Sequence, residues 1–190
     1  GRRVINNITA SASMYLIKTI FSVVLSIGMI LFGHGYPFKP IQLTVISACC
    51  VGIPTFFLTY EPNFKRVSGD FLKTVFKNAF PFAFMIAICS TIIVNGGRVL
   101  GLEKEMLSTI CVLLTSWCYY SGLRHIYSPL SHYRSFVIHI MQIVLYISLI
   151  VGHQFLGLGN IDYIGAITLM FLVTFSKVIY LLNFEYILHF

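Results

Sequence analysis

Six long stretches almost free of charge constrain this chain more than any other feature. They cover residues 15–33, 41–60, 78–97, 106–123, 135–152 and 163–176, and Lys18 is the only Asp, Glu, Lys or Arg within them. Each is close to the ~20 residues that a membrane-crossing helix needs. Only 10% of the chain is charged, against roughly 25% in soluble domains. The sequence therefore predicts an all-α, polytopic integral membrane protein.

Transmembrane strands are the alternative for such a chain, and they would alternate apolar and polar residues over ~10 positions. Stretches such as "AFPFAFMIAIC" and "ITLMFLVTF" do not alternate, so helices are favoured. With their flanking residues, the six predicted helices form one transmembrane domain over residues 1–190 and span residues 12–33, 41–60, 72–97, 106–123, 134–152 and 163–184.

Lys and Arg predict the orientation, because they collect in cytoplasmic loops. Eight lie on the side of the N-terminus: Arg2, Arg3, Lys65, Arg66, Lys73, Lys77, Arg124 and Arg134. The opposite loops hold Lys39, Arg98 and Lys104. We expect both termini to be cytoplasmic in a multi-pass cell-membrane protein with the lipid bilayer as its partner. The net charge of +7 then reflects topology, and no nucleic-acid partner is expected.

The chain lacks the residues of a self-contained enzyme. It has no nucleotide-binding glycine loop, no metal-ligand cluster and no Ser/His/Asp arrangement, so we assign no catalytic residue. All five cysteines lie in apolar segments without a C-x-x-C pair, which favours buried thiols over a disulfide framework or a soft-metal site. Since it opens with "GRRVINN" and no Met, we expect a piece of a longer protein.

Polar residues in the first span share one helical face. Ser11, Tyr15, Lys18, Ser22 and Ser26 are spaced 4, 3, 4 and 4, and we expect this face to point inward. Lys18 lies about one turn inside the apolar boundary. It either extends its stem to the interface, borders a transport site as a fixed charge, or forms a structural ion pair.

The second span contains residues that weaken a helix. Pro54 cannot donate a backbone hydrogen bond, and its ring crowds the carbonyl four residues back, with Gly52 adding flexibility. We therefore predict a helix broken at Gly52–Pro54. Such a break persists in a membrane where it lines a cavity or meets another helix, and its free carbonyls suit hard cations. A kink that serves only packing is the alternative.

Two motifs in the first third resemble the membrane region of P-type cation-transporting ATPases. "GRRVINNI" at Gly1–Ile8 resembles the start of the fifth transmembrane helix of that family. "PIQLTVIS…GIPTFFLTYEPN" at Pro40–Asn63 resembles the sixth, with its P-x-Q-L opening and G-x-P break. The motifs come in family order, and four more spans follow, as in helices 5–10 of calcium- and magnesium-type pumps.

The resemblance implies the membrane part of a phosphorylation-driven pump. ATP and Mg²⁺ would act in upstream cytoplasmic domains of the same protein, which would also supply transmembrane helices 1–4. The transported cation would be the substrate, with an ion pathway along the first two spans. The candidate residues are Lys18, Ser22, Gln42, Ser47, Cys50, Val51, Gly52 and Pro54.

The chain departs from calcium pumps at the acidic positions. Val51 stands where those pumps have an Asp, and Ser22 aligns with a family Glu. This pattern resembles a bacterial branch that is poor in acidic ion ligands, so the metal stays open, with calcium one possibility. Two alternatives from other classes remain: a stand-alone six-helix channel or carrier, and a membrane assembly subunit. A D-K-T-G-T motif upstream of Gly1 would favour the pump.

Overall fold

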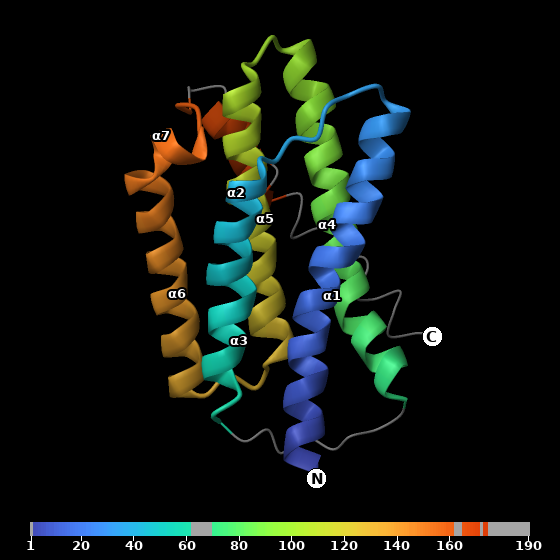
Figure 1. Ribbon diagram of the computed structural model, residues 1–190, viewed down its shortest axis with the longest axis vertical. Helices are drawn as coiled ribbons and strands as arrows, with labels where there is room; N and C mark the ends of the chain where they lie inside the picture. Colours follow the sequence, from blue (N-terminus) through green and yellow to red (C-terminus); the bar gives the residue numbers. More distant parts are fainter. Residues whose placement is uncertain (1, 62–69, 162–164, 172, 175–190) are drawn as a thin grey trace.

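A computed structural model describes residues 2–61, 70–161, 165–171, 173 and 174, and its regular elements are all helical. The helices are α1 (Arg2–Leu31), α2 (Pro40–Ile46), the π-helix η1 (Ser47–Gly52), α3 (Ile53–Leu58), α4 (Phe71–Val99), α5 (Lys104–Ile126), α6 (His132–Val151) and α7 (His153–Leu156). The long helices run along the same axis of the molecule (Figure 1). The all-α prediction is confirmed.

Five of the six predicted spans correspond to described helices that are long and apolar enough to cross a membrane. These are Val4–Leu31, Pro40–Leu58, Phe71–Val99, Lys104–Ile126 and His132–Val151. The sixth predicted span, 163–184, lies largely outside the described residues, so its existence stays a prediction. The short helix α7, in the expected loop after the fifth span, was not predicted.

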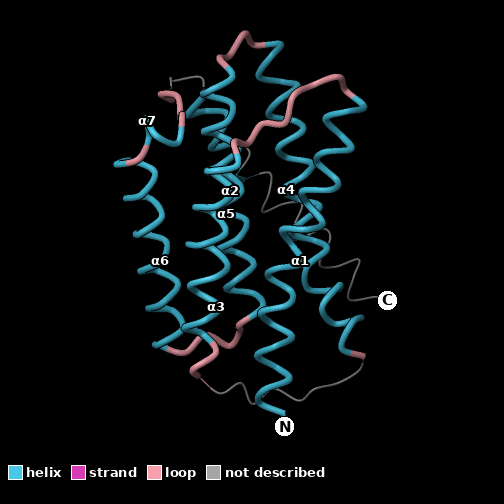
Figure 2. The backbone as a smooth tube through the Cα atoms, viewed as in Figure 1, coloured by secondary structure: helices cyan, strands magenta, loops and turns pink. Residues whose placement is uncertain are grey.

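The helices join through short connections at two ends of the bundle (Figure 2). At the lower end, α1, α4 and α6 begin and α3 and α5 finish; at the upper end, α1 and α4 finish and α2 and α5 begin (Figure 1). Asp70 caps α4 by accepting a hydrogen bond from the Leu72 amide at 3.2 Å, and Ser131 caps α6 by accepting from the Arg134 amide at 3.1 Å. Such oxygen caps satisfy amides that a helix start leaves unpaired.

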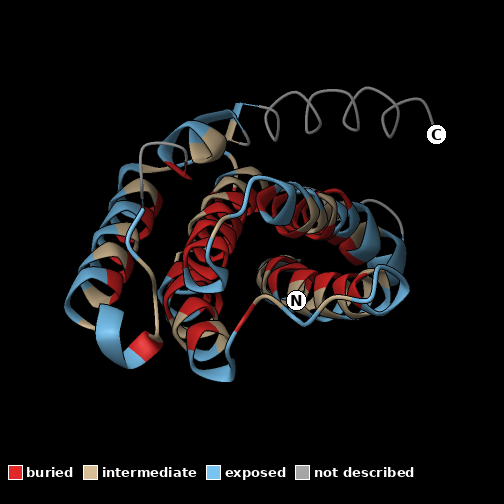
Figure 3. Cartoon of the chain, turned by 90° about the horizontal axis from the view of Figure 1, so that it is seen from above, coloured by how far each residue is buried: buried red, intermediate tan, exposed pale blue. Residues whose placement is uncertain are grey.

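Helix α5 is the centre of the bundle, and α1 packs along α4 beside it. Seen from above, buried residues concentrate where these helices face one another, and α6 turns an exposed face outward (Figure 3). Small residues allow the close approach. Ala79 and Ala83 of α4 are fully buried, and a methyl group built on Gly122 of α5 would meet Ile17 and Phe82 at 3.5 Å.

Within the described residues, the face of α1 that packs on its neighbours is not the predicted polar face, and the inward orientation of that face in a longer protein stays a prediction. The buried stripe of α1 is apolar and consists of Met14, Ile17, Phe21, Leu25 and Met29. The predicted polar face is only half-buried, and Tyr15 is 54% exposed. The physical reason is that 14, 17, 21, 25 and 29 also repeat at helical spacing, and close contact with α4 and α5 gains more from apolar side chains.

The predicted break in the second span falls at the right place but has a different form. The backbone does not unwind at Gly52–Pro54. Instead, Ser47–Gly52 forms a π-helix and α3 continues directly from Ile53. A π-helix is wider than an α-helix, so it relieves the crowding between the Pro54 ring and the carbonyl four residues back without exposing several backbone groups.

Candidate functional site

The π-helix η1 lies inside the protein. Cys50 and Val51 are completely buried, and Cys49 is nearly so. The amide of Ile53 donates to the carbonyl of Ala48, five residues earlier. This five-residue register defines a π-helix, and π-turns within membrane helices are frequent at functional sites.

A tyrosine from α5 takes the place of the donor that Pro54 lacks. Continued by one residue, the five-residue register would pair the nitrogen of residue 54 with the carbonyl of Cys49. Proline has no N–H, and the Tyr120 hydroxyl instead donates to the Cys49 oxygen at 3.3 Å. The side chains of Tyr120 and of Ser116, one turn earlier in α5, also lie beside the Cys50 thiol. Thus α5 stabilises the irregular turn.

Hydroxyl groups of the same helix bond the neighbouring carbonyls. Thr55 Oγ1 donates to the carbonyl oxygens of Val51 at 2.7 Å and Gly52 at 3.1 Å, and Ser47 Oγ donates to Leu43 at 2.6 Å. Each carbonyl oxygen has two lone pairs, so a bonded carbonyl still has one for another partner. The segment therefore presents neutral oxygen ligands rather than carboxylates.

The first span approaches Gly52 of η1 through Tyr15. A methyl group built on Gly52 would lie 3.9 Å from the Tyr15 hydroxyl. Lys18 and Ser22 are half-buried on α1. Ser22 lies near Tyr36 in the loop before α2, and burial raises the pKa of that tyrosine. The proposal that Lys18, Ser22 and the η1 residues form one ion pathway stays a prediction.

Gln42 cross-links the upper end of the bundle. Its side chain is completely buried, and its Oε1 accepts from the Lys39 amide and from Ser108 Oγ, both at 2.9 Å. Its Nε2 donates to the Leu156 carbonyl at 3.0 Å. These bonds tie α2 to α5 and α7, so the geometry gives Gln42 a structural role. The prediction that it borders the ion pathway is not tested.

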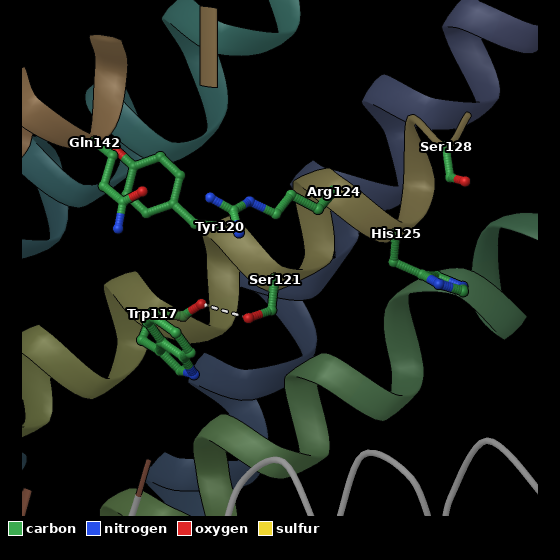
Figure 4. A pocket seen from close by; sticks show the side chains of 7 residues that line it. All are labelled: Trp117, Tyr120, Ser121, Arg124, His125, Ser128 and Gln142. Atoms are coloured by element: carbon green, nitrogen blue, oxygen red, sulfur yellow. Dashed lines mark hydrogen bonds between the residues drawn. The ribbon is translucent and has the colours of Figure 1, made fainter. Parts of the chain in front are cut away.

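A cavity of about 500 Å³ opens beside Tyr120. Figure 4 shows Tyr120 of α5 next to Gln142 of α6, with His125 on the opposite side, toward α4. Arg124 also lines it and donates to His139 Nε2 at 3.2 Å. The polar side chains of Ser121 and Arg124 in this cavity therefore lie within about two helical turns of Tyr120, whose hydroxyl stabilises η1.

At the lower end, a buried arginine holds three segments together. Arg134 is 4% exposed; its Nε lies 3.3 Å from a Glu61 carboxylate oxygen, and its Nη1 donates to the carbonyls of Tyr127 and Pro129. Ser131 donates to the same Glu61 oxygen at 2.6 Å. The Tyr127 hydroxyl is 3.3 Å from Ser11 Oγ of α1, and burial raises its pKa. This network connects α1, α3 and α6.

Sequence reasoning missed the hydroxyls that stabilise the π-helix, Tyr120, Ser116 and Thr55. A signal existed for two of them, since Ser116 and Tyr120 are four residues apart and share a face of the fourth predicted span, which is α5. Nothing in the sequence said that this face meets the second span. Among the described residues, no three His, Cys, Asp or Glu side chains are grouped to hold a metal ion.

Five described helices that are long and apolar enough to cross a membrane, one of them containing a π-turn, define a polytopic membrane protein. No protein-family model matches the chain, and no solved structure matches it significantly. Curated proteins do match it, and we report three of them. It is 37% identical over 122 residues to "Probable cation-transporting ATPase exp7" of Streptococcus pneumoniae. It is 30% identical over 131 residues to "Calcium-transporting ATPase CtpE" of Mycobacterium bovis, and 29% over 127 residues to the protein of that name from Mycolicibacterium smegmatis.

These matches cover 60% of this chain but only 16% of each relative. They confirm the resemblance to cation-transporting ATPases that the two motifs predict. The chain thus spans a small part of the curated relatives it matches.

Proposed function

We propose that this chain is the membrane part of an ATP-driven cation pump. The similarity to proteins named cation- and calcium-transporting ATPases over 60% of the chain carries the proposal. The buried π-helix beside Pro54 supports it, because irregular backbone at membrane depth serves to bind ions in many transporters.

In this proposal, the ion pathway runs along η1 and the facing side of α1. The carbonyls of Val51 and Gly52, with the hydroxyls of Ser47 and Thr55, offer oxygen ligands. The Ser47 and Thr55 hydroxyls donate to backbone carbonyls. A small rotation of these two side chains would turn their oxygens toward a cation. Lys18 sets a fixed positive charge near the entrance and limits the charge that the pathway holds. Cys50, Val51 and Pro54 shape the turn.

The catalytic chemistry would lie outside this chain. Upstream cytoplasmic domains would bind ATP and Mg²⁺, and upstream transmembrane helices 1–4 would complete the ion site. Helix α1 is one continuous helix of 30 residues, about 45 Å at 1.5 Å per residue. It is longer than the bilayer core of about 30 Å, so it can carry movement from a cytoplasmic domain to η1.

The proposed setting is a bacterial cell membrane, with six spans and both termini on the cytoplasmic side. The lower end in Figure 1 would then be cytoplasmic. A stand-alone channel or carrier, or an assembly subunit, does not account for the similarity to ATPases, and no described contact favours either.

ATP hydrolysis by the purified full-length protein, measured across a panel of mono- and divalent cations, tests the proposal. A pump predicts stimulation by at least one cation and ATP-dependent uptake of that cation into sealed vesicles. Pro54→Ala should lower the apparent cation affinity, because an N–H at residue 54 would compete with Tyr120 for the Cys49 carbonyl and reshape the turn. Cation flux that needs no ATP would instead identify a channel or carrier.

A further inference from the structure

A second cavity, of about 430 Å³, lies at the upper end of the bundle. Three segments far apart in the sequence line it. They are the loop from Gly35 to Lys39, the last turns of α4 at Val94 and Arg98, and the first turns of α5 from Lys104 to Ser108. The described spans begin or finish at this level, which places the cavity where a bilayer core would meet its headgroups.

Three basic side chains, which we call the upper basic cluster, line this cavity: Lys39, Arg98 and Lys104. Glu105 is the one acidic residue in its wall. Within the described part of the chain, no member of the cluster forms an ion pair with a carboxylate. All three residues are exposed, and like charges that face one cavity repel one another, so an anion in the cavity would be attracted by all three.

Two members of the cluster, Lys39 and Arg98, are held in place by the surrounding fold. Gln42 fixes the Lys39 backbone and also Ser108 in the opposite wall. The Lys39 ammonium donates to the Gly157 carbonyl at 3.3 Å. The Arg98 guanidinium donates to His34 Nδ1 at 2.6 Å.

The loop between α1 and α2 is anchored too. Phe38 is buried, and its ring centroid lies 6.2 Å from that of Phe21. His34 Nε2 is 3.0 Å from Asn95 Oδ1. A charged ligand would therefore meet groups that are already positioned, which reduces the entropic cost of binding.

We propose that the upper basic cluster binds the phosphate of an anionic membrane phospholipid. Arg and Lys at an interface recognise phosphate through charge-assisted hydrogen bonds, and basic pockets between transmembrane helices bind anionic headgroups. Val94, Leu107 and Tyr36 complete the wall and suit the glycerol and upper acyl chain better than a free phosphate ion. The proposal does not depend on which cation, if any, the protein transports.

Binding of short-chain phosphatidylglycerol to the detergent-solubilised full-length protein tests this site, with native mass spectrometry counting the bound lipid. The informative variant is Arg98→Gln with Lys104→Gln. The matched control is Lys73→Gln with Lys77→Gln, which removes two exposed charges at the lower end. At about 1 kcal/mol for each basic residue near an anionic headgroup, the first pair should raise the Kd about 30-fold. The control should leave it unchanged.

Two further arms separate the possible outcomes. Arg98→Lys keeps the charge and should keep most of the binding, which distinguishes lost charge from lost folding. Short-chain phosphatidylcholine and inorganic phosphate should each compete poorly with phosphatidylglycerol. Equal binding by the two double variants would overturn the site. Inorganic phosphate that binds as tightly as phosphatidylglycerol would overturn the lipid assignment.

Discussion

Replacing Tyr120 by Phe removes the one hydroxyl that bonds the Cys49 carbonyl at the π-turn. Both residues are buried, with exposed fractions of 2% and 7%. A buried group that loses its partner costs about 1–3 kcal/mol. The hydrogen bond is long, at 3.3 Å, so we expect about 1 kcal/mol of lost stability.

Pro54 makes this prediction more specific, because it creates the unpaired carbonyl in the first place. In Pro54→Ala, the new N–H can reach the Cys49 oxygen along the five-residue register. The Tyr120→Phe change should then cost less in the Pro54→Ala background than in the wild type. We expect a coupling free energy of about 0.5–1 kcal/mol, typical of groups that share a partner.

Unfolding of the full-length protein by a denaturing detergent measures both variants and their combination. Tyr133→Phe is the control, because its hydroxyl also donates to a helix carbonyl, that of Phe57 at 3.2 Å. Tyr133 is 41% exposed, so the loss of its hydroxyl should cost little stability. Additive effects of Tyr120→Phe and Pro54→Ala would refute the reasoning that Tyr120 replaces the missing proline donor.

Three further changes test other parts of the structure by the same unfolding assay or by activity. Arg134→Gln and Glu61→Gln should each destabilise by about 3 kcal/mol, because the first removes the donor to the Tyr127 and Pro129 carbonyls and the second leaves the buried Arg134 charge without its carboxylate; a Glu61→Gln variant as stable as the wild type would contradict this. Gly97→Ala would place a methyl group against the Leu107 side chain and should cost about 1–3 kcal/mol, whereas Gly96→Ala meets open space and should be neutral or stabilising. Lys18→Ala should alter cation-stimulated ATPase activity more than stability; unchanged activity at equal expression would count against a role for its charge.

The sequence predicted the parts of the fold that follow from local chemistry. Continuous apolar stretches place the helices, because a chain in lipid must satisfy its backbone internally. The irregularity before Pro54 was placed to within a few residues.

What the sequence could not predict depends on which faces meet in space. The first span carries a polar stripe and an apolar stripe of equal regularity, and only packing against α4 and α5 shows that Met14, Ile17 and Phe21 face inward. Likewise, Pro54 predicts a missing hydrogen bond but not its replacement, since Tyr120 is 66 residues away in the chain (120 − 54). The missing hydrogen bond is local to Pro54, whereas the group that replaces it comes from another helix.

The most direct test of the ion pathway is the cation concentration that half-maximally stimulates ATP hydrolysis by the full-length protein. Thr55→Val removes the hydroxyl that bonds Val51 and Gly52, and Thr44→Val removes a comparable hydroxyl outside η1, bonded to the Pro40 carbonyl at 3.0 Å. We predict that Thr55→Val raises this concentration about tenfold, equivalent to about 1.4 kcal/mol, and that Thr44→Val leaves it unchanged. Wild-type values for both variants, with ATP hydrolysis still stimulated by the cation, would contradict the account.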